Sequence, residues 1–181
     1  SERAHLLAAK ALERPGSAQR ELRELKRQLE ELAARVPTAQ RQYYFEKPII
    51  TDENLQSIVL KAAQNAGSLG ELDANIRTEM IAVDSYITEE KQQIIDKTMP
   101  VEIEIGRTFY KVGYKGKKAT PFIREFSFEL ADYLPENFCI PDGREIMLRY
   151  HYNDDDIRYL TAGEVKKIAN DQRGAQSRPN R

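Results

Sequence analysis

Apolar side chains in residues 17–36 recur at the spacing of a helix that packs along one narrow stripe. They alternate steps of three and four residues, at Leu22, Leu25, Leu29, Leu32 and Val36. This is the a/d spacing of a coiled-coil seam, and polar residues fill nearly every other position. The seam spans only about two and a half heptads, which is marginal for an isolated coiled coil in water. The segment therefore needs a partner, inside or outside the chain.

A second helical pattern precedes the seam over residues 4–13, and Pro15-Gly16 separates the two segments. Together they predict a helical arm over residues 1–37, which ends at Pro37 because proline disfavours helix in the residue before it. Two arrangements remain open. Either the arm closes on itself as a hairpin, or its five seam residues bind another protein or a second copy of the chain.

Helical signals continue over residues 51–99. Thr51 is the expected N-cap of a first helix that Gly67 ends, and a second amphipathic helix follows this glycine directly. A third helix is expected to open at Thr88 and to end before Pro100. The chain then changes from a helical to an alternating pattern.

Two alternating runs flank Gly106-Arg107 and predict a β-hairpin with a two-residue turn. The expected cross-strand pairs are Ile105 with Thr108, Ile103 with Tyr110, Glu102 with Lys111 and Val101 with Val112. This register places every apolar residue except Phe109 on one face of the hairpin. The agreement between spacing and turn makes one buried and one solvated face the expected result.

A second hairpin is expected around the turn Pro141-Asp142-Gly143, and it can be overlaid on the first. We therefore predict two repeated hairpins over residues 100–152, then short helices over 154–170, and a disordered polar tail over 171–181. Thr161 and Glu164 form the expected capping box of the last helix.

The whole pattern predicts an α+β fold. It would consist of an N-terminal helical arm or coiled-coil hairpin, a helical segment, and a small antiparallel sheet of two repeated β-hairpins with short helices. The expected domains are the arm at residues 1–37 and an α+β domain at residues 38–170. The chain begins at Ser1, not Met, which suggests a trimmed chain or a piece cut from a longer protein.

Net charge excludes a protein that coats nucleic acid with its whole surface, because the 181 residues sum to -1 at pH 7. The local distribution is uneven: residues 106–124 contain no Asp or Glu, and acids outnumber bases over residues 125–145. No apolar run approaches the roughly 20 residues that cross a bilayer, and no leader resembles a secretory signal. We therefore expect no membrane partner and a cytoplasmic location.

Catalytic and metal-binding motifs are absent from the sequence. A single cysteine cannot form an internal disulfide, and together with two histidines it cannot build a typical zinc site. No glycine-rich phosphate-binding loop is present, and neither histidine lies in a recognisable catalytic motif. We expect no metal, no cofactor and no catalytic residue, so the chain alone is not predicted to be an enzyme.

The acid-free segment is the strongest functional feature, because it mixes cations with aromatic side chains. Its candidate nucleic-acid-binding residues are Arg107, Phe109, Lys111, Lys115, Lys117, Lys118 and Arg124. Cations meet phosphates and aromatic rings stack on bases, so single-stranded RNA or DNA is the expected ligand. In the alternative interpretation the lysines decorate a turn and protect a sheet edge. The leucine seam would then carry function as a protein-interaction or scaffolding surface.

The two hairpin segments also carry a family resemblance. Its motifs are Pro100-x-x-Ile103-x-Ile105, Tyr110-x-Val112-x-Tyr114, Pro135-Glu136 and Ile140-Pro141-Asp142-Gly143-Arg144-Glu145-Ile146. Over residues 86–152 this resembles the C-terminal region of bacterial DEAH-box helicases, where a proline precedes a hairpin with a Pro-Ser/Asp-Gly-Arg turn. The resemblance implies an accessory module of an ATP-dependent RNA helicase. The ATP-binding, Asp-Glu-Ala-His and arginine-finger motifs of that family are not in this chain.

Overall fold

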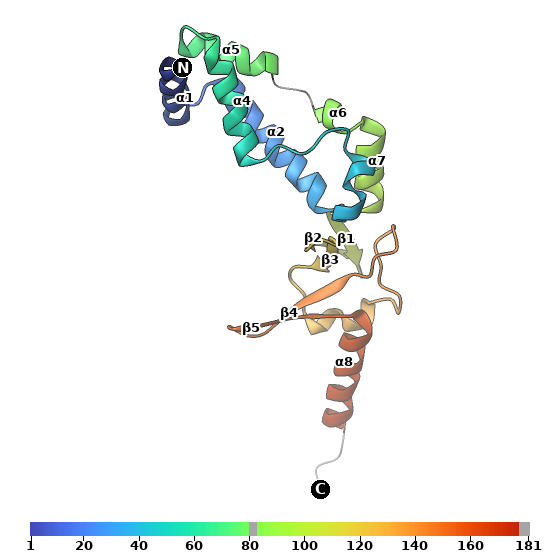
Figure 1. Ribbon diagram of the computed structural model, residues 1–181. Coiled ribbons are helices and arrows are strands. Elements are labelled where there is room, and N and C mark those ends of the chain that lie inside the picture. Colours follow the sequence, from blue (N-terminus) through green and yellow to red (C-terminus); the bar gives the residue numbers. More distant parts are fainter. Residues whose placement is uncertain (80–82, 178–181) are drawn as a thin grey trace. The chain divides into compact units, whose positions relative to one another are not determined.

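The computed structural model describes residues 1–79 and 83–177, and these form an α+β fold (Figure 1). The chain divides into two compact units. Unit 1 contains Ser1–Ala33 and Arg41–Gln92, and unit 2 contains Ala34–Gln40 and Gln93–Arg181. The segment predicted as a separate arm at residues 1–37 thus lies largely in one unit with helices that follow it.

Unit 1 is helical. The helices that begin in it are α1 (Glu2–Glu13), α2 (Ser17–Ala34), α3 (Arg41–Tyr44), α4 (Asp52–Gln64), α5 (Leu69–Glu79), α6 (Val83–Tyr86) and α7 (Glu89–Thr98). α1 packs against α4 and α5, which also pack against each other. Across the described ranges of the chain, no helix combines the length and apolarity that crossing a membrane requires.

The leucine seam is buried inside the chain. None of its five residues is more than 6% exposed, and Leu29 at the centre is 0% exposed. Four of them lie in unit 1 and Val36 lies in unit 2. Since α1 packs on α4 and α5, the predicted hairpin of the first two helices does not close by itself; the seam is covered within the folded chain.

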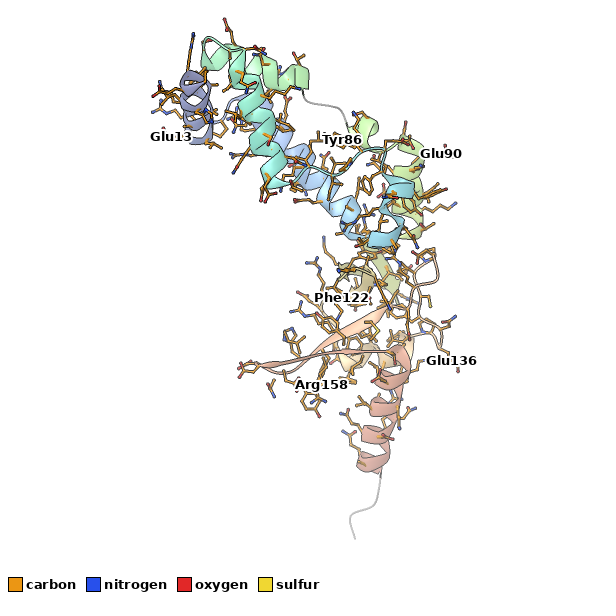
Figure 2. All side chains as sticks on the ribbon, in the orientation of Figure 1. Glu13, Tyr86, Glu90, Phe122, Glu136 and Arg158 are labelled. Atoms are coloured by element: carbon orange, nitrogen blue, oxygen red, sulfur yellow. The ribbon has the colours of Figure 1, made fainter. Side chains whose placement is uncertain are left out.

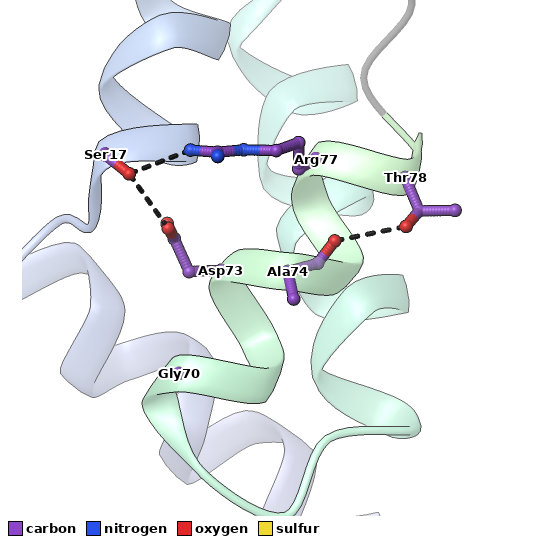
Figure 3. A pocket seen from close by; sticks show the side chains of 6 residues that line it. All are labelled: Ser17, Gly70, Asp73, Ala74, Arg77 and Thr78. Atoms are coloured by element: carbon purple, nitrogen blue, oxygen red, sulfur yellow. Dashed lines mark hydrogen bonds between the residues drawn. The ribbon is translucent and has the colours of Figure 1, made fainter.

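The N-terminus of α2 is fixed by the side chains of α5 (Figure 3). The Asp73 carboxylate accepts the backbone N–H of Ala18 at 3.1 Å and the Ser17 hydroxyl at 3.2 Å. Arg77 donates to the same hydroxyl at 2.9 Å. The first N–H groups of a helix lack partners within the helix and favour a negative charge, so Asp73 satisfies both requirements.

Unit 2 contains a sheet with the strand order β1-β2-β3-β4-β5. The strands are β1 (Glu102–Ile105), β2 (Thr108–Lys115), β3 (Thr120–Ile123), β4 (Met147–Asn153) and β5 (Asp156–Leu160). The pairs are antiparallel except β3 with β4, which is parallel. The predicted first hairpin is confirmed in register: Ile105 faces Thr108, Ile103 faces Tyr110 and Glu102 faces Lys111.

The predicted second hairpin forms only next to its turn. Around the turn at Pro141-Asp142-Gly143, Cys139 bridges Glu145, and the N–H groups of Ile140 and Ile146 donate to the carbonyl oxygens of Arg144 and Phe138 at 3.0 and 2.8 Å. The residues beyond it leave this partner and form β4, which pairs in parallel with β3 and antiparallel with β5. The first hairpin is therefore not repeated over its full length, because the second alternating run finds its further hydrogen bonds in other strands.

The short helix expected from Asp154 is also wrong, since residues 156–160 form β5. The Asn153 side chain accepts the backbone N–H of Asp155 at 3.1 Å, which makes a turn in place of a helix start. After this turn, Ile157 and Tyr159 alternate with residues of the opposite face. The acidic run is thus the tip of the β4–β5 hairpin.

The last helix, α8 (Ala162–Ser177), begins as predicted but is longer. Thr161 Oγ1 accepts the N–H of Glu164 at 3.1 Å, and the Glu164 carboxylate accepts the N–H of Thr161 at 3.2 Å. This confirms the capping box. The helix covers residues 171–177, where a disordered tail was expected, and residues 178–181 of that tail lie outside the described residues. Arg173 anchors this part by an ion pair with Asp132.

The core of unit 2 lies against one face of the sheet. Sheet residues in or against this core include Ile103, Ile105, Tyr110, Val112, Tyr114, Ile123, Leu148, Tyr150 and Leu160. They are covered by the connection over residues 124–146, which includes the 3-10 helix η2 (Phe128–Tyr133), and by α8. A parallel pair needs such a crossover connection, whereas an antiparallel pair can use a short turn.

Candidate nucleic-acid interface

The sheet face opposite the core, here called the open face, carries cations and aromatic rings. Strand alternation assigns to it Glu102 and Glu104 of β1, Phe109, Lys111, Gly113 and Lys115 of β2, and Phe122 of β3 with Arg124 just beyond. From the other strands it includes Met147, Arg149 and His151 of β4, and Ile157 and Tyr159 of β5. None of these residues belongs to the core cluster of unit 2. The alternation predicted for the first hairpin therefore extends across the sheet.

Three of the predicted site residues, Phe109, Lys111 and Arg124, line one groove of about 470 Å³. β2 and β3 pair with Val112 opposite Ile123, so Lys111 and Arg124, the residue after β3, lie at the same end of β3. The Phe109 side chain is 63% exposed. Glu125 is the one acid of the lining. An exposed ring beside two cations can stack on a base and meet its phosphates.

Gly113 allows side chains of β3 to lie across β2. A Cβ at this position would come within 2.6 Å of the Phe122 ring and 3.0 Å of Arg124 Nε. The Phe122 ring (Figure 2) meets the Tyr159 ring edge to face, with 5.4 Å between the centroids. Lys115 Nζ lies 3.0 Å from the centroid of Tyr159. The groove is therefore followed on the same face by a second group of rings and cations.

The seven predicted site residues do not form one patch. Arg107 lies in the turn before β2, and Lys117 and Lys118 lie in the turn after it. The 8 residues of β2 separate these turns by roughly 23 Å, at about 3.3 Å per residue. Positive charge thus follows the whole length of β2 and does not gather at one rim.

None of the six predicted cations forms an ion pair within the described part of the chain. The acids that follow them in the sequence pair with other partners. Asp142 pairs with Arg144 at 2.7 Å, and Asp132 pairs with Arg173. The charge of the basic segment therefore remains available to an anionic ligand.

The residues of the open face that were missed at the sequence level include Phe122, Arg149, His151 and Tyr159. Arg149 Nε is buried and has no hydrogen-bond partner among the described residues. Tyr159 was missed because β5 was predicted as helix. The alternation of Ile157 and Tyr159 with polar and core-facing neighbours was the signal that could have found it.

The turn that carries Lys117 and Lys118 is stabilised by hydrogen bonds from Arg144. Its guanidinium donates to the carbonyl oxygens of Ala119 and Arg35, the latter at 2.8 Å. Tyr114 lies beside it and donates its hydroxyl to the carbonyl oxygen of Pro100 at 2.7 Å. Burial raises the pKa of Tyr114 to about 12, partly offset by the nearby Arg144 charge. These contacts give the end of β2 a fixed backbone.

No family model, curated protein or solved structure matches this chain significantly. The resemblance to the C-terminal region of DEAH-box helicases stays a prediction.

Proposed function

We propose that the chain is a non-catalytic module that binds single-stranded nucleic acid, RNA in the first place, on the open face of unit 2. The groove of Phe109, Lys111 and Arg124 is the observation that carries the proposal. A base would stack on the exposed Phe109 ring, and the flanking phosphates would meet the two cations. Stacking does not depend on base identity, so the expected preference among sequences is weak.

A single strand fits this surface better than a duplex. In a duplex the flat faces of the bases are already stacked on each other and cannot reach an aromatic side chain. The open face offers Phe109 at one end and the Tyr159–Phe122 pair further along. Arg149, with its unpartnered Nε, lies between the β3 and β5 positions of this face. Several successive nucleotides would therefore contact the sheet.

The alternative interpretations are weaker on this structure. β2 pairs with β1 through residues 108–111 and with β3 through residues 112–115. Lysines that protect a sheet edge would account for Lys111 and Lys115 alone. The leucine seam is at most 6% exposed, so a protein partner could reach it only after local unfolding. Neither lysine decoration nor a docking arm explains the aromatic rings among the cations.

The test is fluorescence anisotropy with labelled oligo-U, oligo-dT and a duplex of equal length at low salt. We expect the single strands to bind more tightly than the duplex. Phe109→Ala should weaken binding about fivefold or more, since a stacked base is worth about 1–3 kcal/mol. Lys111→Glu with Arg124→Glu should abolish it.

The matched control is Lys167→Glu on α8, an exposed cation that lies outside the open face. It should leave the affinity nearly unchanged. The proposal fails if no single strand binds at low salt, or if the control lowers the affinity as much as the double reversal does.

A further inference from the structure

Unit 1 contains a second groove, of about 610 Å³, that the proposed nucleic-acid site does not use. It is lined by residues between α3 and the N-terminus of α4. Phe45, Pro48 and Ile49 give it an apolar wall. Its volume lies in the range of about 300–1,000 Å³ that is typical of small-molecule sites, which combine apolar walls with a few polar groups.

Arg41 is a polar residue of this groove whose Nε lacks a protein partner among the described residues. Its side chain is half-buried, and its Nε is buried without a hydrogen bond among the described residues. A buried donor that is left unpaired is costly, so native structures nearly always supply an acceptor. The planar guanidinium offers paired donors whose geometry matches a carboxylate.

The remaining charges of the lining also favour an anion. Lys47 is exposed and adds a second cation. Glu46 is the carboxylate of the lining, and its Oε1 lies 3.8 Å from Lys91 Nζ. Lys91 also donates to the carbonyl oxygen of Tyr43, which fixes it beside Glu46. The negative charge of the lining is thus compensated from outside the groove. Lys47 Nζ lies 5.7 Å from the centroid of the Tyr86 ring, which leaves Arg41 as the cation for a ligand.

We propose that this groove binds a small amphipathic carboxylate, meaning a molecule with one carboxylate and an apolar chain. The carboxylate pairs with the Arg41 guanidinium, and the chain packs against Phe45, Pro48 and Ile49. This assigns unit 1 a ligand site that is independent of nucleic-acid binding by unit 2.

Titration of the full chain with octanoate, followed by NMR shifts of backbone amides, tests the proposal. We expect saturable shifts in residues 41–54. Octanol and acetate should each bind at least about tenfold more weakly than octanoate. Arg41→Gln should weaken octanoate binding about tenfold or more. Arg41→Lys keeps the charge without the paired donors and should give an intermediate loss.

Two further variants separate the groove from general effects. Ile49→Glu places a carboxylate beside the proposed anion site and should abolish binding while the spectrum outside residues 41–54 is kept. Arg20→Gln, an exposed arginine of α2 outside the groove lining, should change nothing. The proposal is overturned if octanoate does not bind, if octanol or inorganic phosphate binds equally well, or if Arg41→Gln and Arg20→Gln behave alike.

Discussion

Gly113 shows how a missing side chain shapes the open face. Its bare Cα leaves room for the Phe122 ring and for Arg124, which reach across β2 from the neighbouring strand. The Phe122 ring is then placed against Tyr159. A residue with no chemistry of its own therefore determines where a ring and a cation of the binding surface lie.

We expect Gly113→Ala to destabilise unit 2 by about 1–3 kcal/mol, because the new methyl group overlaps the Phe122 ring at 2.6 Å. Chemical denaturation of the wild type and the variant measures this difference. Gly163→Ala on α8 is the control, since the nearest atom to its Cβ is 3.8 Å away and alanine favours a helix. Equal stability of the two variants would contradict the packing described for Gly113.

The raised pKa of the Tyr114 hydroxyl predicts a loss of stability at alkaline pH. Its pKa is raised to about 12 in the folded chain, above the ordinary value of 10.0. The folded state holds the proton more tightly, so this contribution is complete below pH 10 and is lost as the pH rises towards 12. Urea midpoints at pH 8 and pH 11 should therefore differ more for the wild type than for Tyr114→Phe. A pH dependence that is identical in both proteins would argue against a buried hydroxyl.

At the scale of elements, α2 is held by burial and not by an external partner. Leu29 is 0% exposed, so Leu29→Ala should lower the free energy of unfolding by about 2–5 kcal/mol. The molar mass from light scattering should stay the same at concentrations where the variant is folded. If the variant instead keeps its stability and lowers the molar mass, the seam is an interface between copies.

Elements whose formation depends on residues close together in the sequence were predictable. The register of β1 with β2 followed from alternation around a two-residue turn, and the start of α8 followed from Thr161 and Glu164. Elements decided by distant pairing were not. β4 has the alternation of a hairpin strand, but its partners β3 and β5 are chosen by the shared core, which no local pattern contains.

The candidate site was predictable to the same extent. Phe109 and Lys111 were placed on the solvated face because the first hairpin had the right register. Arg149 and Tyr159 join this face only through the pairings of β4, and those depend on the crossover. A sequence reading could find the cations near one turn but not the rings that other strands bring beside them.

At the scale of the whole molecule, the net charge does not indicate the charge of the proposed binding surface. The chain sums to -1, yet the five cations along β2 and its flanking turns, and Arg124 after β3, have no ion pairs in the described structure. Affinity for a single strand should therefore fall linearly with salt on logarithmic axes. Each phosphate contact contributes a slope of about -0.7, so Lys111→Gln should reduce the slope by about that amount and Lys167→Gln should not. Equal slopes for both variants would exclude Lys111 as a phosphate contact.

The single parallel pair of the sheet has a consequence for protein engineering. The crossover that β3 and β4 require packs on the core side together with α8. Substitutions at 109, 111 and 151 consequently change side chains of the open face that do not belong to the core cluster of unit 2. Ligand preference and thermal tolerance become separable traits, so a combinatorial library at these positions could be screened for new specificities without a parallel screen for folding.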